Sequence, residues 1–426
     1  MFNSLTKKRW LILMASCMIN LCLGSIYAWS VFAAPMAEHI GNLTGVSLGS
    51  GDLAIVYTVA NSVGPITMIS GGWVNDRFGP RKVILTGGLM FAAGMILSGF
   101  ATSVAFLIMS YGLLSGLGLG MAYGCTISSC VKFFPDKRGL VGGITTAVYG
   151  MGSVILPPVV TAIVRTFDVP TAFKGIGVTF AVIVAVCAQL IQKCPDDFAP
   201  EGWSPPAGSP SVSRTSKDWR GMLASPVFYV MICLLTCGAF SGMMIISQAS
   251  AVAQTVAGLS ALAASTAVSV LALFNTAGRI AAGYLSDRIG RVNTLTLACL
   301  FSIGGLLLLY FSSRGNPVSF FVGVSVVGAS FGSFMGVFPG FTADQFGAKN
   351  NSVNYGIMFI GFALAGFFGP TAMNGIFQSS GSYKKAFLVA CGLSLCGLFL
   401  TVVYRLISRK FASEKVPASQ IAAKNG

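Results

Sequence analysis

Long apolar runs recur along the whole chain, each close to the ~20 residues that a helix needs to cross a membrane. Six runs lie in the first half of the chain and six in the second. They cover residues 10–34, 52–74, 83–102, 105–131, 139–164 and 172–193, then 226–248, 259–285, 292–311, 317–341, 352–377 and 383–408. We therefore predict an all-α membrane protein whose twelve transmembrane helices form two pseudo-symmetric six-helix bundles.

The composition excludes an ordinary soluble domain. Hydrophobic residues make up 54% of the 426 residues and charged residues only 9%, whereas soluble domains have about 25% charged residues. The 52 glycines predict close helix packing, because small residues let membrane helices approach one another. Residues 194–224 are rich in Pro, Ser, Gly and charge, and are too polar to pack as a core. The expected organisation is an N-terminal bundle at 1–193, a cytoplasmic linker at 194–224, a C-terminal bundle at 225–411 and a cytoplasmic tail at 412–426.

The net charge of +15 is distributed unevenly. Of the 27 Lys and Arg residues, 21 fall on the side of the membrane that carries both termini and the linker, five fall on the opposite side, and Arg279 lies within a run. This positive-inside pattern places both termini in the cytoplasm and makes a nucleic-acid partner unnecessary. We expect a multi-pass protein of the cell membrane, which is the inner membrane in a Gram-negative bacterium.

The eleven cysteines lie mostly in apolar runs, and His39 is the only histidine. Neither their spacing nor their partners match a metal cluster, and no catalytic triad spacing is present. We expect no metal, no cofactor and no enzymatic activity.

Two loops of one pattern follow the second and the eighth run. Each has a glycine four residues before an Asp-Arg pair, then another glycine and a further basic residue, and the copies are 211 residues apart. Pro158 and Pro370 keep a similar offset of 212. Repeated halves with a site at their interface are typical of secondary transporters that alternate access. The loop residues are Gly72, Asp76, Arg77, Gly79 and Arg81, and then Gly283, Asp287, Arg288, Gly290 and Arg291.

We interpret these loop residues as gates and scaffold rather than substrate contacts. The first glycine of each loop lets two helices approach closely, and the aspartate can accept from backbone donors at a neighbouring helix end or pair with an arginine. Making and breaking such a cluster favours one conformation over another. The alternative is a plain basic loop that only follows the positive-inside pattern.

Arg279 stands deep inside the eighth run. No carboxylate lies between residues 259 and 285, and Arg279 is eight residues, or about 12 Å of helix, before Asp287. A cation near the middle of a bilayer about 30 Å thick is costly and usually functional. The planar guanidinium of an arginine can donate two parallel hydrogen bonds to one carboxylate. We therefore predict that Arg279 binds an anionic substrate. In the alternative, it extends to the cytoplasmic edge or caps a helix carbonyl.

Other residues can complete such a site. Asn275 lies one turn before Arg279 and can donate to the substrate or orient the guanidinium, with an interhelical hydrogen bond as the alternative. Tyr123 and Tyr149 each offer a hydroxyl on an apolar ring, as small organic acids require, although tyrosines also pack. Tyr27 and Trp29 lie near the outer end of the first run, where aromatic residues also mark the lipid interface.

The paired loops, the twelve runs and the linker together resemble the major facilitator superfamily over essentially the whole chain. Within it, five motifs are similar to the oxalate/formate antiporter and monocarboxylate transporter group. They are Gly24 to Ser30 (Gly-Ser-Ile-Tyr-Ala-Trp-Ser), Tyr123-Gly124, Phe134 to Gly139 (Phe-Pro-Asp-Lys-Arg-Gly), Asn275 with Arg279, and Asn354-Tyr355-Gly356.

This resemblance implies roles for single residues. In that group the arginine of the eighth helix is implicated in binding substrate carboxylate, and tyrosines at matching positions line the chamber. Animal monocarboxylate transporters have a titratable Asp where this chain has Asn275. Oxalate transporters have a lysine in the eleventh helix, where this chain has Phe362 and no Lys or Arg between residues 355 and 373. Because one buried cation balances one negative charge, a monoanion is expected. Phe362 as lipid-facing bulk would not restore the missing charge.

We therefore expect a secondary active transporter that moves a small monocarboxylate such as lactate, pyruvate or formate by alternating access. Proton-linked symport and anion exchange both stay open, because no acidic residue lies deep in a run. The alternatives are oxalate/formate-type exchange of a dicarboxylate and, from another class, a carboxylate sensor that does not transport. The absence of a selectivity-filter repeat disfavours a channel. The expected partners are the substrate, the bilayer and, in symport, a proton, for a monomeric carrier.

Overall fold

The computed structural model describes residues 2–196, 198–204, 216–313 and 316–413. The middle of the predicted linker and most of the predicted tail lie outside these residues. Within the described ranges every regular element is a helix. The first half of the chain forms α1 (Phe2–Leu23), η1 (Gly24–Ala28), α2 (Trp29–Thr44), α3 (Ala54–Phe78), α4 (Pro80–Ser98), α5 (Val104–Leu107), η2 (Ile108–Ser115), α6 (Gly116–Phe133), α7 (Arg138–Thr166) and α8 (Val169–Leu190). The second half forms α9 (Trp219–Leu223), α10 (Pro226–Val256), α11 (Ala261–Ile289), α12 (Arg291–Phe311), α13 (Pro317–Phe346), α14 (Asn351–Met358), α15 (Ile360–Ser380) and α16 (Lys384–Ser413).

Eleven helical segments of the described chain are long and apolar enough to cross a membrane, which confirms the predicted all-α membrane fold. The second predicted run is α3, which is 25 residues long but does not belong to these eleven. Its polar residues, among them Asn61, Asn75 and Asp76, lower its hydropathy. At 1.5 Å per residue α3 is about 37 Å long, and it packs along α6. The twelfth crossing therefore stays a prediction.

Three predicted runs are not single α-helices. The first continues through the 3-10 turn η1 into α2 and ends at Thr44, about ten residues beyond the predicted end. The fourth consists of α5, the π-helical segment η2 and α6, and the eleventh is divided into α14 and α15 at Phe359. Hydropathy does not reveal these breaks, because the residues involved are mostly apolar. The first break lies at a helix crossing, where Gly24 packs directly against the backbone of Tyr149.

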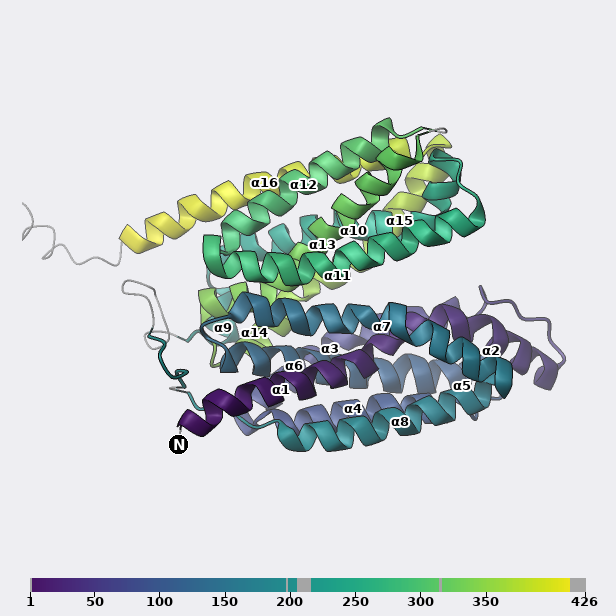
Figure 1. Ribbon diagram of the computed structural model, residues 1–426, viewed down its shortest axis with the longest axis horizontal. Coiled ribbons are helices and arrows are strands. Elements are labelled where there is room, and N and C mark those ends of the chain that lie inside the picture. Colours follow the sequence, from purple (N-terminus) through teal and green to yellow (C-terminus); the bar gives the residue numbers. More distant parts are fainter. Residues whose placement is uncertain (1, 197, 205–215, 314–315, 414–426) are drawn as a thin grey trace, which may run out of the picture.

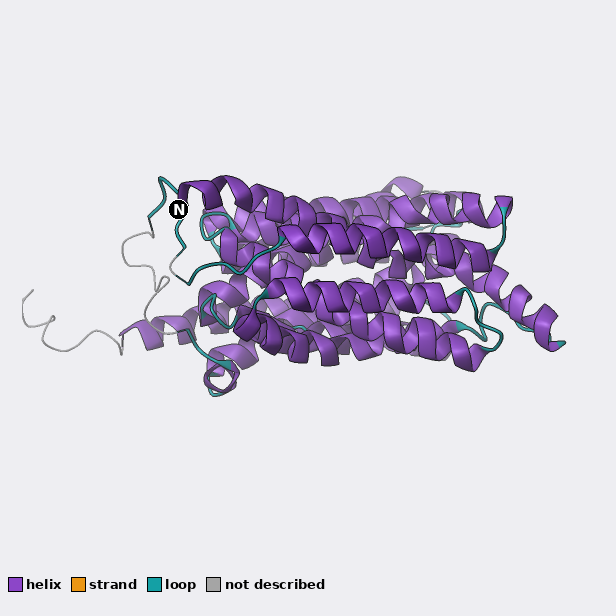
Figure 2. Cartoon of the chain, turned by 90° about the horizontal axis from the view of Figure 1, so that it is seen from below, coloured by secondary structure: helices purple, strands orange, loops and turns teal. Residues whose placement is uncertain are grey.

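The helices form two bundles that lie side by side (Figure 1). The first bundle contains α1 to α8 and the second contains α9 to α16, and the long helices of both run along the long axis of the molecule (Figures 1 and 2). The N-terminus, the described parts of the linker and the end of α16 all lie at one end. We call this the basic end.

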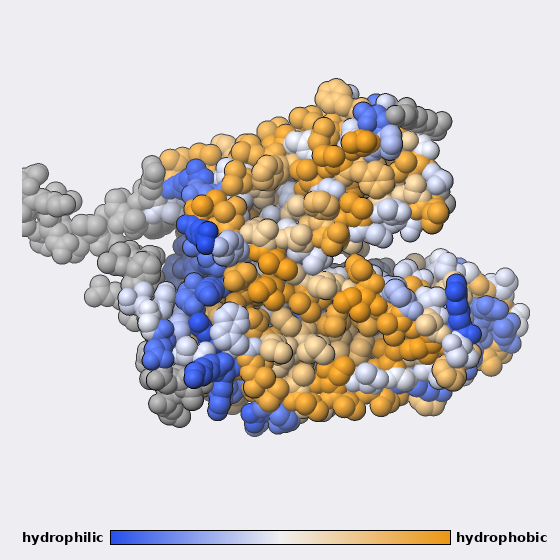
Figure 3. Space-filling model, in the orientation of Figure 1, coloured by the Kyte–Doolittle hydropathy of each residue, from blue (hydrophilic) through white to orange (hydrophobic). Residues whose placement is uncertain are grey.

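The two bundles contact each other mainly through α7 with α11 and α13, and through α3 with α14. At the basic end they meet over a hydrophilic surface (Figure 3). Toward the opposite end the space-filling view shows an open gap between them, whereas their outer flanks are apolar. The molecule is therefore closed at the basic end and open at the other.

All eleven cysteines are free thiols, and five of them are buried. In the described part of the chain no three His, Cys, Asp or Glu side chains lie together in a way that could hold a metal ion. The five buried cysteines therefore act as small packing residues.

The closest helix packing gives the first prediction. A Cβ added at Gly120 on α6 would collide with the backbone of Gly64 on α3, and overpacking a filled interior costs about 1–3 kcal/mol. The matched variant Gly304→Ala adds the same methyl group on α12, where nothing lies within 4 Å. Thermal unfolding in detergent should show a lower Tm for Gly120→Ala and an equal or higher Tm for Gly304→Ala. Equal losses in both variants would contradict this packing.

Candidate functional site

Arg279 lies where α11 is pressed between α7 of the first bundle and α13 of its own bundle. Glycines permit this close approach, because a Cβ at Gly143 on α7 or at Gly336 on α13 would collide with the Arg279 carbonyl oxygen. A Cβ at Gly332 would likewise collide with the carbonyl oxygen of Asn275. The Arg279 residue is only 5% exposed. The helix backbone around this cation is thus fixed from two sides.

The Arg279 guanidinium binds two neutral acceptors. Its Nε donates to Oδ1 of Asn275 at 3.2 Å, and its Nη1 donates to the carbonyl oxygen of Thr146 on α7 at 2.6 Å. The second bond crosses between the bundles, so Arg279 does contact a helix carbonyl, as the alternative interpretation of the sequence suggested.

The Nη2 group of this guanidinium is unused. Among the described residues, Nη2 makes no hydrogen bond and Arg279 makes no ion pair. A buried cation without a counter-ion is unfavourable, and an anion that reaches it gains a charge-assisted bond. The arrangement is therefore suited to binding a carboxylate.

A row of aromatic rings runs between the bundles beside this cation. The Tyr149 ring lies 5.3 Å from that of Tyr27 and 4.4 Å from that of Tyr123. The Tyr123 ring lies 6.0 Å from that of Phe359, which stacks on Phe362 at 4.5 Å. The first three rings belong to the first bundle and the last two to the second. Closure or opening of the gap must therefore change this row.

A Cβ added at Gly150, the neighbour of Tyr149 on α7, would lie 3.6 Å from the guanidinium carbon of Arg279. Tyr123, whose ring packs on Tyr149, and Tyr355 are both buried. Tyr355 lies on α14, and its ring is 5.8 Å from that of Phe359. Arg279 and the phenols thus lie in one region, with a cation and hydroxyl groups set among apolar rings. Such a mixture suits a small organic acid.

The structure brings together all the predicted substrate residues except Trp29. The indole of Trp29 is buried in the first bundle, where it packs on Tyr111 at 4.7 Å. Phe362 does not only face lipid, since it is partly buried and stacks on Phe359.

Sequence reasoning missed three contributors to this region. Tyr355 stood in a recognised motif but was not assigned to the site, and Phe359 resembles any other apolar residue of its run. The Thr146 carbonyl carries no signal in a sequence, because every residue has one.

Asn20 ties α1 to α6 and α7, the helices that carry Tyr123 and Tyr149. It is buried on α1, accepts from Thr126 Oγ1 of α6 at 2.7 Å, and donates to the Thr145 carbonyl oxygen of α7 at 3.2 Å. Thr145 precedes Thr146, the residue that accepts from Arg279. Asn20 therefore fixes the backbone on which this acceptor lies.

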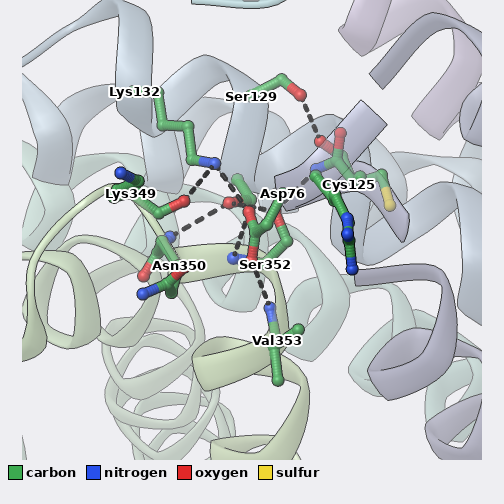
Figure 4. Close-up of polar contacts among 12 residues, drawn as sticks. Asp76, Cys125, Ser129, Lys132, Lys349, Asn350, Ser352 and Val353 are labelled. Carbon is green, nitrogen blue, oxygen red and sulfur yellow. Dashed lines mark hydrogen bonds and ion pairs between the residues drawn. The ribbon is translucent and has the colours of Figure 1, made fainter. Parts of the chain in front are cut away.

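At the basic end, Asp76 joins the end of α3 to the start of α14 (Figure 4). Its carboxylate accepts from the backbone N–H of Ser352 at 3.3 Å and of Val353 at 3.1 Å, and from Lys132 Nζ at 2.7 Å. Lys132 also donates to the carbonyl oxygen of Lys349 at 2.9 Å. A carboxylate at a helix N-terminus pairs with unsatisfied N–H groups and the positive end of the helix dipole. These bonds connect the two bundles.

Asp287 makes the equivalent contacts at the end of α11. It accepts from the N–H groups of Gly139 and Leu140 at the start of α7, both at 2.8 Å, and from Arg291 Nη1 at 2.7 Å. Arg291 Nε also pairs with Asp344 of α13 at 2.8 Å. The repeated loops thus place the same contact on both sides of the interface between the bundles.

The glycines of these loops allow the close approach. A Cβ at Gly72 would lie 2.7 Å from the carbonyl oxygen of Ser352, and one at Gly283 would collide with the α7 backbone. Gly79 and Gly290 follow α3 and α11 with φ angles of 94° and 91°. Residues other than glycine rarely adopt a positive φ of this size.

The other basic residues of the loops contact their own bundle. Arg77 lies over the Trp73 ring at 5.5 Å, and Arg288 lies over the Tyr284 ring at 4.3 Å. Arg81 donates to carbonyl oxygens at the end of α8 at 2.7 and 3.2 Å. These three residues act as scaffold within one bundle rather than as contacts between the two.

Comparison with known families agrees with this geometry. The model of the Major Facilitator Superfamily matches residues 13–370. The chain belongs to this superfamily. It is therefore a multi-pass membrane transporter rather than an enzyme, as the sequence predicted.

Its relatives include the predicted group. The chain is 28% identical to the oxalate:formate antiporter of Oxalobacter formigenes over 91% of this chain and 89% of that protein. It is 28% identical to the MFS-type transporter YhjX of Escherichia coli K12, over 84% and 86%, and 26% identical to human monocarboxylate transporter 12, over 84% and 73%.

Solved structures share the fold. FucP in the outward conformation gives a TM-score of 0.70 at 14% identity, covering 94% of this chain and 99% of FucP. A double Trp mutant of XylE gives 0.75 at 15% identity, covering 93% and 95%.

The Asp287 contact gives a second prediction. In Asp287→Asn the charge is lost and only one oxygen can still accept, so amide exchange at Gly139 and Leu140 should rise by about tenfold, as expected for losing about 1.4 kcal/mol of charged hydrogen bonding. Asp168→Asn is the matched control, because Asp168 caps α8 at the opposite end by accepting from Thr171 N–H at 2.6 Å. Hydrogen–deuterium exchange of the peptide covering residues 138–142 is the measurement. Unchanged exchange in Asp287→Asn would show that this bond does not hold α7.

Proposed function

We propose that this protein is a secondary carrier that moves a small monocarboxylate anion across the membrane by alternating access, with Arg279 as the charge partner of the anion. The observation that carries the proposal is the nearly buried Arg279 guanidinium, which has no ion pair and an unused Nη2 among the residues that the structure describes. A substrate carboxylate can replace the Thr146 carbonyl or add to it, and a charged acceptor binds a guanidinium more strongly than a neutral one.

The charge balance favours a monoanion. Neither α14 nor α15 contains a Lys or Arg, and Phe362 packs against Phe359 where a second cation would be needed for a dianion. An uncompensated charge in a low-dielectric site is strongly unfavourable. The aromatic rings instead provide an apolar surface for the body of a small acid. Lactate, pyruvate and formate have the required single charge.

The conformation supports alternating access. If the basic end faces the cytoplasm, as the positive-inside pattern indicates, the gap in Figure 3 opens to the outside and the Asp76 and Asp287 clusters close the inside. Transport then requires these clusters to break while the outer gap closes. The two bundles can move as units because most helix packing lies within each of them.

Binding and movement can be linked through Arg279. Its bond to Thr146 connects α11 to α7 across the interface. When the bundles rock, an empty carrier must break this bond and leave the cation with only the Asn275 oxygen of its own helix as an acceptor, which is costly. A bound carboxylate removes that cost. This argument favours exchange of one anion for another. Proton-linked symport would instead require that the substrate carry its own proton or that water transfer the proton.

Two other functions have specific tests. Dicarboxylate exchange, as the name of the Oxalobacter formigenes relative describes, requires that oxalate compete strongly. A carboxylate sensor would bind acids but would give no saturable counterflow in proteoliposomes loaded with the same acid. Thermal-shift screening of small acids on the purified protein should first identify a ligand, and counterflow should then be measured with it.

Arg279→Ala is expected to abolish transport. Losing a charged hydrogen bond to a buried anion costs about 2 kcal/mol or more, so uptake of labelled acid should fall by at least about 30-fold. Arg279→Lys keeps the charge but not the planar fork and should recover only part of the activity. Arg165→Ala, an exposed arginine at the opposite end of α7, is the control and should transport normally. Normal uptake by Arg279→Ala protein in proteoliposomes would refute the assignment of this site.

Oxalate should inhibit uptake at least about tenfold more weakly than the best monocarboxylate, because its second charge has no partner. Phe362→Lys adds a cation to the chamber and should strengthen inhibition by oxalate relative to lactate. Phe362→Leu removes the ring without adding charge and should not strengthen inhibition by oxalate. Competition against labelled substrate, measured for all three proteins, checks this expectation. Strong oxalate inhibition of the unmodified protein would contradict the argument from one cation.

A further inference from the structure

The end of the linker contacts the turn between α13 and α14. The Lys217 N–H donates to the Phe346 carbonyl oxygen at 2.9 Å. The Lys217 carbonyl oxygen accepts from Asn354 Nδ2 at 3.0 Å and from Asn350 Nδ2 at 3.3 Å. Gly347 follows α13 with a φ of 91°, and a Cβ there would lie 2.5 Å from Ser216 Oγ. The linker backbone is therefore held by specific bonds rather than by loose surface contact.

Asn354 is the most buried member of this contact. Its relative exposure is 0%, and its Oδ1 has no hydrogen-bond partner among the described residues. A buried amide with one unsatisfied oxygen is unfavourable, so the bond from its Nδ2 is the polar contact that this side chain retains. The linker carbonyl supplies that contact.

The position of Asn354 on α14 connects three parts of the molecule. The preceding residue, Val353, donates its N–H to Asp76 in the contact between the bundles. The following residue, Tyr355, lies beside the candidate binding site, since its ring is 5.8 Å from that of Phe359, which in turn lies 6.0 Å from that of Tyr123. The eight-residue helix α14 thus contains the N–H groups that bind Asp76, the linker contact at Asn354 and the Tyr355 ring of the candidate site. A rotation or shift of α14 changes all three together.

The first end of the linker reaches the same turn more weakly. Asp196 pairs with Lys349 at 3.7 Å, but both side chains are more than 60% exposed. Exposed ion pairs contribute little because water and salt screen them. The partly buried bonds from Asn350 and Asn354 to Lys217 therefore dominate the hold of the linker on this turn.

We propose that Asn354 is a positioning residue through which the end of the linker, residues 216–218, holds α14 in the register that presents its N-terminal N–H groups to Asp76 and its Tyr355 ring to the chamber. The linker is then a part of the gate at the basic end and not only a connection. This goes beyond the proposed function and does not depend on which anion is carried.

Asn354→Asp tests this with little change of shape. The substitution replaces the donor by an acceptor that faces the Lys217 carbonyl oxygen, so α14 should lose this support. Amide exchange in the peptide covering residues 351–357 should rise by about tenfold, whereas exchange at residues 138–142, the other gate, should not change. Asn350→Ala removes the longer bond and should act in the same direction with a smaller effect.

Two controls separate positioning from general stability. Asn293→Asp alters another asparagine near the basic end, on α12, whose Nδ2 donates to the Ile289 carbonyl oxygen at 2.7 Å, and should leave the exchange of residues 351–357 unchanged. Lys217→Ala removes the side chain but keeps the main-chain bonds, and should also behave like the unmodified protein. If Asn354→Asp raises exchange equally at both gates, or at neither, the proposal is overturned.

A substrate-based readout completes the test. With an acid identified by thermal shift, Asn354→Asp should weaken its binding through the displaced Tyr355, and it should do so more than Asn293→Asp. The exchange experiment needs no substrate. A failure of the monocarboxylate assignment would therefore leave the exchange result intact, and a failure of the linker proposal would leave Arg279-dependent transport intact.

Discussion

The cost of one cation inside the membrane determines how the two bundles meet. Arg279 has no carboxylate partner among the described residues, so it uses neutral oxygens, one from its own helix and one from α7 of the other bundle. Glycines at the crossings bring the helices close enough for the second bond. The same cost gives the site its chemistry, because an anion is the partner that most reduces it. In the proposed function, the residue that is costly to bury is therefore also the one that binds the anion.

The closed end depends on a different device, which is used twice. Asp76 and Asp287 each accept from two backbone N–H groups at the N-terminus of a helix in the other bundle. The geometry depends on a preceding glycine that lets the helices touch and on a following glycine that turns the chain. Such bonds are strong enough to favour one conformation and local enough to break as a unit. The linker adds to this end by holding α14 through Asn354.

Prediction from the sequence was accurate where local composition decides the outcome and failed where contacts decide it. The apolar runs predicted the helices and their membrane location, but they did not predict the break at Phe359, which leaves the local hydropathy unchanged. The sequence also places Arg279 within an apolar run and has no Lys or Arg between residues 355 and 373, and the resemblance to oxalate transporters implies what that missing cation means. In contrast, Trp29 and Tyr27 are two residues apart in one motif, yet only Tyr27 joins the row of rings. Which of two neighbouring aromatics faces the gap depends on how η1 turns against α7.

The sequence by itself determined that the chain is a membrane-embedded bundle with two related halves, that one cation lies deep in it, and that paired loops recur at one end. These properties follow from residue type and spacing, because the bilayer rejects unpaired charge and polar backbone wherever they occur. Only the tertiary structure decided that Arg279 reaches Thr146, that rings from both bundles form one row beside it, and that the linker backbone binds Asn354. These contacts join residues more than 100 positions apart and depend on helix crossings to within an ångström or so, which no pattern along the chain encodes.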